Sequence, residues 1–302
     1  MEDPVFARAK TRRGPVNATA LSLVLVAAVV HAAWNLAAKR ISSGGTQFVW
    51  LYYTVSAVLL LPVTVVLLVV EPERPQWSWL LAAVVTAVLH VAYGVVLQRG
   101  YRVGDLSVVY PVARGTGPLL SVLAAVLVLG ERPGVLGLAG AFLVIAGVLV
   151  ISTGRQAEDP RAVKAGILYG LLTGATIAGY TLWDAHSVTG IGVPPVVYFG
   201  LGSLLQSAML VPGALADRAE VRRIWREQRR EVLLVAVLSP VAYILVLFAL
   251  TMAPVSLVAP ARELSIVIGG VAAWLVLGES NAVRRLAGSV IVLSGIAAIA
   301  AA

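Results

Sequence analysis

The sequence predicts an all-α integral membrane protein with ten transmembrane helices, arranged as an inverted pair of five-helix repeats. Three observations support this fold class. Of the 302 residues, 59% are hydrophobic and 13% are charged, whereas a typical soluble domain carries about 25% charged residues. The apolar residues fall into stretches of about 20, the length of a membrane-spanning helix. The second half of the chain repeats the pattern of the first half.

Short polar connectors separate the apolar stretches from one another. In chain order, the predicted helices are 18–39, 46–70, 79–98, 106–130, 134–153, 165–188, 193–216, 232–252, 255–278 and 283–301. The chain thus divides into a polar tail (1–16), a first repeat (17–153), a linker (154–164) and a second repeat (165–302). Because the first apolar run is long enough to span a bilayer, we expect a retained helix rather than a cleaved signal peptide.

The repeat is clearest in the fourth and ninth predicted helices. Both copies place an arginine shortly after a proline and end in Leu-Gly-Glu, so that Arg114 corresponds to Arg262 and Glu131 to Glu279. Further pairs, in chain order, are His31 with Tyr180, Trp34 with Trp183, Asn35 with Asp184, Pro62 with Pro212, Tyr93 with Tyr243, and Gly140 with Gly288. Matches in all five pairs of helices, in the same order, indicate a duplicated unit rather than chance similarity among apolar helices.

Each repeat has an odd number of helices, so the two copies must lie upside down relative to each other in the membrane. Inverted repeats of this kind are typical of secondary transporters, whose substrate site lies near the bilayer midplane between the copies. The side of the membrane on which the termini lie stays open. The segment 217–231 alone carries six arginines on the side opposite the termini, which favours external termini by the positive-inside rule.

Composition and motifs exclude several classes of protein. The chain has no cysteine, which excludes disulfides, thiolate metal sites and cysteine nucleophiles. Neither an H-E-x-x-H pair, a G-x-S-x-G elbow nor a phosphate-binding G-x-x-x-x-G-K-[ST] loop occurs. We therefore expect no enzyme, no cofactor, no metal and no ATP-driven pump. The net charge of +8 comes mostly from residues that flank the apolar stretches, so we expect no nucleic-acid partner.

Five segments together resemble the EamA-type branch of the drug/metabolite transporter (DMT) superfamily. They are HAAWNLAAKR at 31–40, GYRVGDLSVVYPVARGTGPLL at 100–120, LGERP at 129–133, YTLWD at 180–184 and LVLGE at 275–279. The resemblance implies secondary transport, often efflux of amino acids or related metabolites. It also implies a cavity lined by helices one, three, four, six, eight and nine, and cytoplasmic termini, in contrast to the charge distribution.

Arg114 and Arg262 are the first candidate substrate-binding residues. Arg114 lies about 12 Å inside its helix at 1.5 Å per residue, where an arginine costs about 2.5–3.5 kcal/mol on insertion scales. One interpretation is that the arginines hold a substrate carboxylate or phosphate. The other is that they satisfy helix-end carbonyls freed by Pro111 and Pro260, or a partner such as Glu263, and serve packing.

Polar and aromatic residues at matching places in the two copies are the remaining cavity candidates: His31, Trp34, Asn35, Tyr93, Tyr180, Trp183 and Tyr243. Such residues close over a ligand and orient it, or else make interhelical hydrogen bonds and anchor helices at the interface. For coupling to protons the candidates are Asp184 and Glu263, with His31 as a third. Asp184 lies about one turn from the end of its predicted span, so a solvated helix-end carboxylate is the alternative there.

Two other groups of residues predict structure rather than chemistry. Glu131 and Glu279 follow the Leu-Gly at the end of a span, and we expect them to orient the reversal into the next helix. Gly166, Gly170 and Gly174 form a small-residue ladder that predicts close helix packing.

The sequence thus predicts a secondary transporter that exports small polar metabolites such as amino acids by alternating access. An intramembrane enzyme acting on lipid, or a non-transporting scaffold, is the alternative. The expected partners are a small-molecule substrate and the lipid bilayer, and a monomer is sufficient. We expect a multi-pass protein of the plasma membrane, which in bacteria is the inner membrane.

Overall fold

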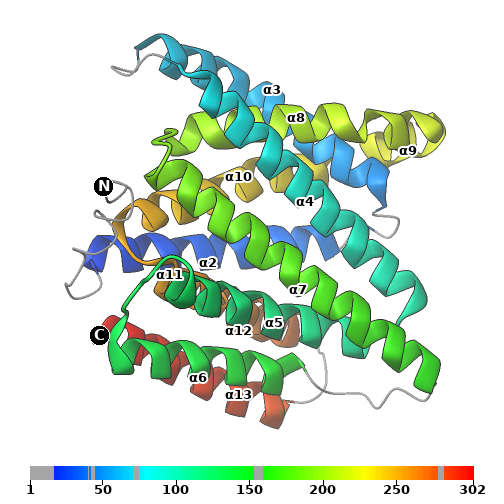
Figure 1. Ribbon diagram of the computed structural model, residues 1–302. Coiled ribbons are helices and arrows are strands. Elements are labelled where there is room, and N and C mark those ends of the chain that lie inside the picture. Colours follow the sequence, from blue (N-terminus) through cyan, green and yellow to red (C-terminus); the bar gives the residue numbers. More distant parts are fainter. Residues whose placement is uncertain (1–16, 40, 42–44, 71–74, 153–158, 278–281) are drawn as a thin grey trace.

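The computed structural model describes residues 17–39, 41, 45–70, 75–152, 159–277 and 282–302. Every regular element in these residues is a helix (Figure 1). The helices are α2 (Ala18–Lys39), α3 (Thr46–Val70), α4 (Trp77–Val103), α5 (Leu106–Leu127), α6 (Gly134–Ser152), α7 (Pro160–Thr189), α8 (Pro195–Ala216), α9 (Arg218–Glu227), α10 (Arg229–Met252), α11 (Val255–Ala261), α12 (Leu264–Leu277) and α13 (Ala282–Ala300).

Eight of these helices are long and apolar enough to cross a membrane: α2 to α8 and α10. The prediction of ten uninterrupted spans is therefore confirmed only in part. The ninth predicted span is divided into α11 and α12, and the apolar part of α13 is the shorter stretch Leu286–Ala300. In the lipid interior only helices satisfy their own backbone groups, which is why apolar stretches of this length form helices.

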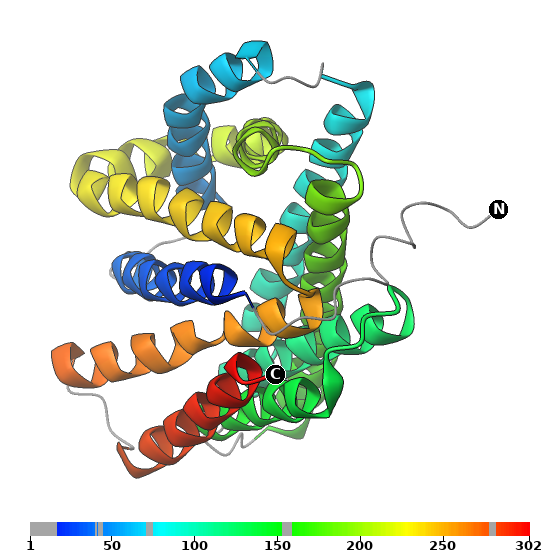
Figure 2. The same ribbon diagram turned by 90° about the vertical axis from the view of Figure 1, so that its left-hand side faces the viewer.

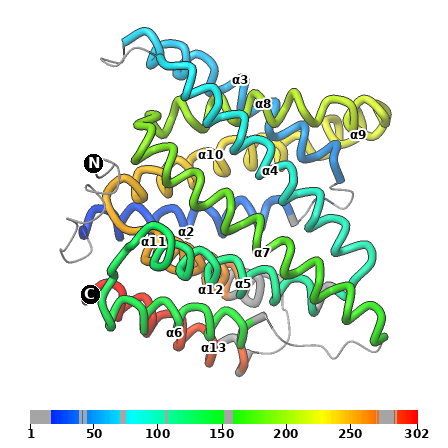
Figure 3. Tube along the Cα trace, viewed as in Figure 1, coloured from blue at the N-terminus to red at the C-terminus, as the bar shows by residue number. Residues whose placement is uncertain are grey.

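Helix contacts repeat between the two halves of the chain. The first helix of the first half, α2, packs against α10 and α12, and the first helix of the second half, α7, packs against the corresponding α4 and α5. Corresponding helices also pack on each other, α3 on α8 and α6 on α13, and Figure 2 shows α12 between α2 and α13. The start of α2 and the C-terminal end of α13 lie at the same end of the bundle (Figure 3).

The α6–α13 contact consists of glycines that meet in pairs. A Cβ atom added to Gly140 would lie 2.6 Å from the carbonyl oxygen of Gly295, and one added to Gly147 would lie 2.8 Å from that of Gly288. Gly140 and Gly147 correspond in the repeat to Gly288 and Gly295, so each glycine faces the counterpart of the other. When two copies of one helix pack antiparallel to each other, the first glycine of each copy lies opposite the second glycine of the other, as it does here.

The predicted ladder of Gly166, Gly170 and Gly174 packs against α5. A Cβ atom added at these positions would meet the side chains of Val108, Val112 and Thr116, at 3.0, 2.7 and 2.6 Å. Glycine therefore allows α7 to approach α5 closely, as small residues do in membrane helix pairs.

The fourth helix of each half has a different shape in the two copies. α5 stays continuous past Pro111, whereas its counterpart is interrupted at Arg262 and Glu263, immediately after Pro260. At the break, the Glu263 amide donates to the carbonyl oxygen of Pro260 and the Ser265 amide to that of Arg262, at 2.9 and 3.2 Å. These tighter i to i−3 bonds replace the α-helical pattern.

Glu131 holds the start of α11. Its two carboxylate oxygens accept hydrogen bonds from the backbone amides of Val255 and Ser256, both at 2.9 Å. We expected Glu131 to orient the reversal into the next helix, but that reversal has positive φ angles at Gly130 and Gly134, 68° and 75°, and the carboxylate instead bonds to the other half of the chain. Its counterpart Glu279 lies outside the described residues.

Replacing Glu131 with alanine should lower the free energy of unfolding by about 1–2 kcal/mol, the cost of a lost helix cap. Thermal unfolding in detergent measures the change. Glu131→Gln, which keeps one acceptor oxygen, should lose less than the alanine variant. Equal stability of wild type and Glu131→Ala would show that this cap contributes nothing.

α9 occupies the segment that the sequence predicted as a polar connector. It is amphipathic: Ile224 is 1% exposed and packs with Val221, Phe48 and Leu51, while Arg223 pairs on the outer surface with Glu220 and Glu227 on the same helix. Figure 1 places α9 at the end of the bundle opposite the labelled C-terminus.

Candidate functional site

Two arginines and one glutamate meet in the interior of the bundle. The Arg114 Nη1 atom lies 3.5 Å from Oε2 of Glu263, and Nε of Arg262 lies 3.9 Å from its Oε1. The Glu263 side chain is 2% exposed, that of Arg262 8% and that of Arg114 21%. Arg114 comes from α5, while the interruption between α11 and α12 carries the other two residues. Glu263, which the sequence analysis named as a possible partner of the arginines, therefore contacts both of them.

This cluster contains more positive than negative charge. Two guanidinium groups share one carboxylate, and both ion-pair distances exceed those of a good charge-assisted hydrogen bond, about 2.7–2.9 Å. The Oε2 atom of Glu263 has no hydrogen bond within the described residues. Removing charge from water is costly unless partners compensate it, so a loosely paired cluster with a net charge of +1 favours binding of an anion.

Four of the predicted cavity residues lie within electrostatic range of these arginines. His31 on α2 and Tyr180 on α7 interact with both Arg114 and Arg262. Tyr93 on α4 interacts with Arg114, and Tyr243 on α10 interacts with Arg262. The ring of Tyr110 lies 5.7 Å below the Arg114 guanidinium, a cation–π contact that the sequence did not suggest.

The other three cavity candidates make local or structural contacts. The Asn35 side-chain amide donates to the carbonyl oxygen of His31 at 2.8 Å, and the Trp34 ring packs edge-on against His31 at 4.8 Å. The Trp183 indole N–H donates to the carbonyl oxygen of Ala82 at 3.0 Å and so ties α7 to α4. Their substrate-binding role stays a prediction.

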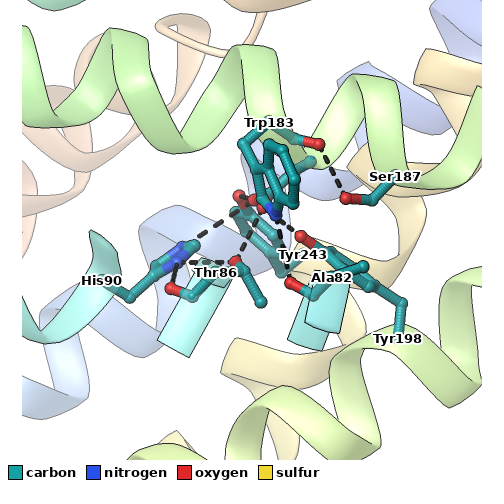
Figure 4. A network of polar contacts seen from close by, with 8 residues as sticks. Ala82, Thr86, His90, Trp183, Ser187, Tyr198 and Tyr243 are labelled. Atoms are coloured by element: carbon teal, nitrogen blue, oxygen red, sulfur yellow. Dashed lines mark hydrogen bonds and ion pairs between the residues drawn. The ribbon is translucent and has the colours of Figure 1, made fainter. Parts of the chain in front are cut away.

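Asp184 forms the centre of a second polar cluster. Figure 4 shows the surrounding residues Thr86, His90, Tyr198 and Tyr243. The Oδ1 atom of Asp184 accepts hydrogen bonds from the hydroxyls of Thr86 and Tyr198, at 2.7 and 2.6 Å, and Oδ2 accepts one from the hydroxyl of Tyr243. The side chain is fully buried, and Nε2 of His90 lies 4.0 Å from Oδ2. Asp184 does lie near the end of α7, but side chains from three neighbouring helices cover it, so the alternative of a solvated helix-end carboxylate is wrong.

Sequence reasoning missed His90, Thr86 and Tyr198 as parts of this cluster. His90 precedes Tyr93 by three positions, so the two share one face of α4, which is the signal that the sequence contained. The imidazole stacks on the Tyr180 ring with centroids 4.2 Å apart, and Tyr180 contacts Tyr93 at 5.8 Å. This aromatic stack connects the Asp184 cluster to the residues around the arginines.

A small recess with an apolar lining lies apart from both clusters. Ala20, Val24, Leu257 and Ile299 line it, between α2, α11 and α13. No charged side chain contributes to its wall, so this recess offers nothing that would select a polar ligand. The predicted cavity shared by both halves stays a prediction.

Comparison with models of protein families assigns the chain to a family. The model of the EamA-like transporter family matches residues 18–153 and again 164–301. The chain belongs to the EamA-like transporter family. The family is one of membrane transporters, as its name says. The two matched ranges show that this EamA-like chain contains two copies of the family unit, as its internal repeat predicted. It is accordingly a multi-pass membrane protein.

A solved structure shares the overall fold of this chain. A chain described only as "Crystal structure of protein" superimposes with a TM-score of 0.74 at 17% sequence identity, over 93% of this chain and 96% of that one. At this identity the likeness shows the fold alone. Comparison with curated protein sequences gives no match.

Proposed function

We propose that the protein is a secondary transporter that exports a small polar metabolite with one anionic group, such as an amino acid, by alternating access. The observation that carries this proposal is the net positive charge of the buried Arg114–Glu263–Arg262 cluster. A substrate carboxylate placed against the guanidinium groups would balance that charge and accept bidentate hydrogen bonds. The export direction follows the resemblance to efflux proteins.

The tyrosines and His31 around the arginines suit the rest of such a ligand. Tyr93, Tyr180 and Tyr243 supply apolar ring faces as well as hydroxyl groups, which are the features of a small-molecule site. They come from α4, α7 and α10, so both halves of the chain contribute to the site.

Alternating access is supported by the difference between the two copies. The same unit has a continuous fourth helix in the first half and an interrupted one in the second half. Inverted repeats are related by an axis in the membrane plane, which exchanges the two sides of the membrane. If each half took the shape of the other, a site open to one side would therefore become open to the other side. A single chain contains both copies, so a monomer suffices, in the plasma membrane.

Lysine in place of Arg262, or of Arg114, should reduce transport at least about tenfold while the protein stays folded. Lysine keeps the charge but loses the planar pair of donors that a carboxylate accepts. Purified protein is screened against a metabolite panel by thermal shift, and uptake of each stabilising compound is then measured in proteoliposomes. Arg223→Lys, on exposed α9, is the matched control and should transport normally. Normal transport by both Arg114→Lys and Arg262→Lys would contradict the anchor.

Counterflow distinguishes this proposal from an enzyme or a scaffold. A carrier exchanges labelled substrate across a membrane with saturation, because its loaded site reorients between the two sides. An enzyme would convert the compound, and a scaffold would give no flux at all.

A further inference from the structure

We infer that Asp184 and His90 form one proton-binding site, and that its proton binds together with an anion at the Arg114–Glu263–Arg262 cluster. The anion half of this inference rests on the proposed function, whereas the proton half stands on its own geometry.

Hydrogen bonds hold the His90 ring in one tautomer. Its Nδ1 atom lies 2.9 Å from the carbonyl oxygen of Thr86 and 3.1 Å from the Thr86 hydroxyl oxygen. A carbonyl oxygen only accepts, so Nδ1 carries a hydrogen, and the Thr86 hydroxyl in turn donates to Asp184. The Nε2 atom, which gains or loses the second proton, is therefore the one that faces Oδ2 of Asp184 at 4.0 Å.

The pair has two protonation states that differ by one charge. Without the extra proton, an ionised Asp184 accepts the three hydroxyl hydrogen bonds and His90 is neutral. With the proton on Nε2 or on Oδ2, the pair has no net charge. The His90 side chain is 15% exposed and Asp184 is fully buried, so the imidazole is the group through which a proton enters, and a ligand ammonium group has no access to the carboxylate.

Charge balance links this pair to the arginines. Among the described residues in the interior of the bundle, four carry a formal charge: Arg114, Arg262, Glu263 and Asp184. The Arg114–Glu263–Arg262 cluster contributes +1 and Asp184 contributes −1, so the sum over the two clusters is zero when the site is empty. A proton alone, or an anion alone, would leave one uncompensated charge in a medium of low dielectric constant, where charge interactions are strong. A proton and a ligand of net charge −1 together restore the balance, so each should strengthen the binding of the other. A zwitterionic amino acid adds no net charge, so the linkage applies to acidic substrates.

Other titratable groups around the pair or around the arginines do not alter this count. They are Tyr180 on α7, Tyr93 on α4, Tyr53 on α3, Tyr198 on α8, Tyr243 on α10, His31 on α2, Arg114 on α5, and Arg262 and Glu263 between α11 and α12. Tyrosines are neutral until about pH 10. His31 counts as neutral because two arginines act on it, and nearby positive charges disfavour an imidazolium. The charged members are those already counted.

The site exists in one half of the duplicated chain. In the repeat, Asp184 corresponds to Asn35, His90 to Pro240, Thr86 to Ala236 and Tyr198 to Phe48. Each of these replacements lacks a titratable group, so the duplication supplies one proton site rather than two. One proton per monoanion is the resulting stoichiometry, which would let an acidic metabolite leave the cell as its electroneutral acid equivalent.

The first experiment tests the proton site without any substrate. Infrared difference spectra of wild-type protein in nanodiscs, recorded on acidification, should show a protonated carboxyl or imidazole signal that Asp184→Asn and His90→Gln alter. His186→Gln, which changes an exposed histidine on the same helix as Asp184, is the matched control and should leave the signal unchanged. Spectra that are identical in wild type, Asp184→Asn and His90→Gln would overturn the proton site.

The second experiment tests the linkage, with benzoate and the carboxylates of the metabolite panel as probes. The affinity of wild type for a bound monoanion should rise about tenfold per pH unit as pH falls, until the site is protonated, and a pH indicator should report uptake of one proton per anion. Asp184→Asn should bind with no pH dependence, because it mimics the protonated state, whereas His186→Gln should behave like wild type.

The outcomes separate the two proposals. An infrared signal from Asp184 or His90, with no anion bound at any pH, would contradict the proposed anion site and leave the proton site standing. Anion binding to wild type that is independent of pH would overturn the linkage and leave the proposed function intact. If Asp184→Asn does not fold, the His90→Gln variant and the proton uptake of wild type decide the question.

Discussion

Glutamine in place of Glu263 should lower the free energy of unfolding by about 3–5 kcal/mol, the loss seen when one partner of a buried ion pair is removed. Glu263 is 2% exposed and is the carboxylate that both Arg114 and Arg262 contact. The variant would leave two guanidinium groups facing each other with no negative charge between them. Urea or thermal unfolding in detergent, followed by tryptophan fluorescence, measures the loss.

Anions should partly restore the stability of Glu263→Gln. With Glu263 neutral, the cluster has a charge of +2, so benzoate or phosphate should raise the unfolding temperature of the variant more than that of wild type. The control is Glu227→Gln, since Glu227 pairs with Arg223 at the surface and is 60% exposed; such a pair contributes about 0–1 kcal/mol. A Glu263→Gln protein as stable as wild type would show that the arginines have other partners.

Alanine in place of Gly140 should separate α6 from α13 and cost about 3 kcal/mol, the upper end of the range for overpacking. The added Cβ would lie 2.6 Å from the carbonyl oxygen of Gly295 and 2.9 Å from the backbone nitrogen of Ile299. Backbone atoms of a helix cannot move aside as a flexible side chain can, so the whole helix must shift. The expected result is a much lower unfolding temperature.

A matched glycine provides the control. Gly94 is also inside a helix, but a Cβ atom added there meets nothing within 4 Å, so Gly94→Ala should be neutral or slightly stabilising, because alanine favours helix over glycine by about 1 kcal/mol. In a double-mutant cycle, Gly140→Ala combined with Gly295→Ala should cost less than the sum, since the first substitution already moves the helices apart. Full additivity would show that the two glycines do not meet.

Much of the fold follows from local sequence. Apolar stretches of membrane-spanning length must become helices, because lipid offers no partners for backbone groups. Duplicated glycines, prolines and arginines correctly predicted a repeated unit, which the family model matches twice. The repeat also suggested His31, Tyr93, Tyr180 and Tyr243 as cavity candidates; they lie within electrostatic range of the arginines, and their cavity role stays a prediction.

The site depends more on contacts between distant parts of the chain. Asp184 is near the end of a predicted span, which suggested contact with water, yet α4, α8 and α10 bury it. Glu131 follows a turn, which suggested a local role, yet it caps a helix 124 residues further on. Pro260 and Pro111 are similar in sequence, yet only the helix with Pro260 is interrupted.

The amino-acid sequence by itself therefore determined the membrane class, the helices, the duplication and the arginines, because each depends on apolar length or on a residue pattern within one copy. Tertiary structure alone decided that His90 faces Asp184, that Glu263 lies between two arginines and that α11 ends at Ala261. The physical reason is that the rotation and approach of packed helices determine which buried polar groups meet, and residues about 100 positions apart in the chain set that packing together.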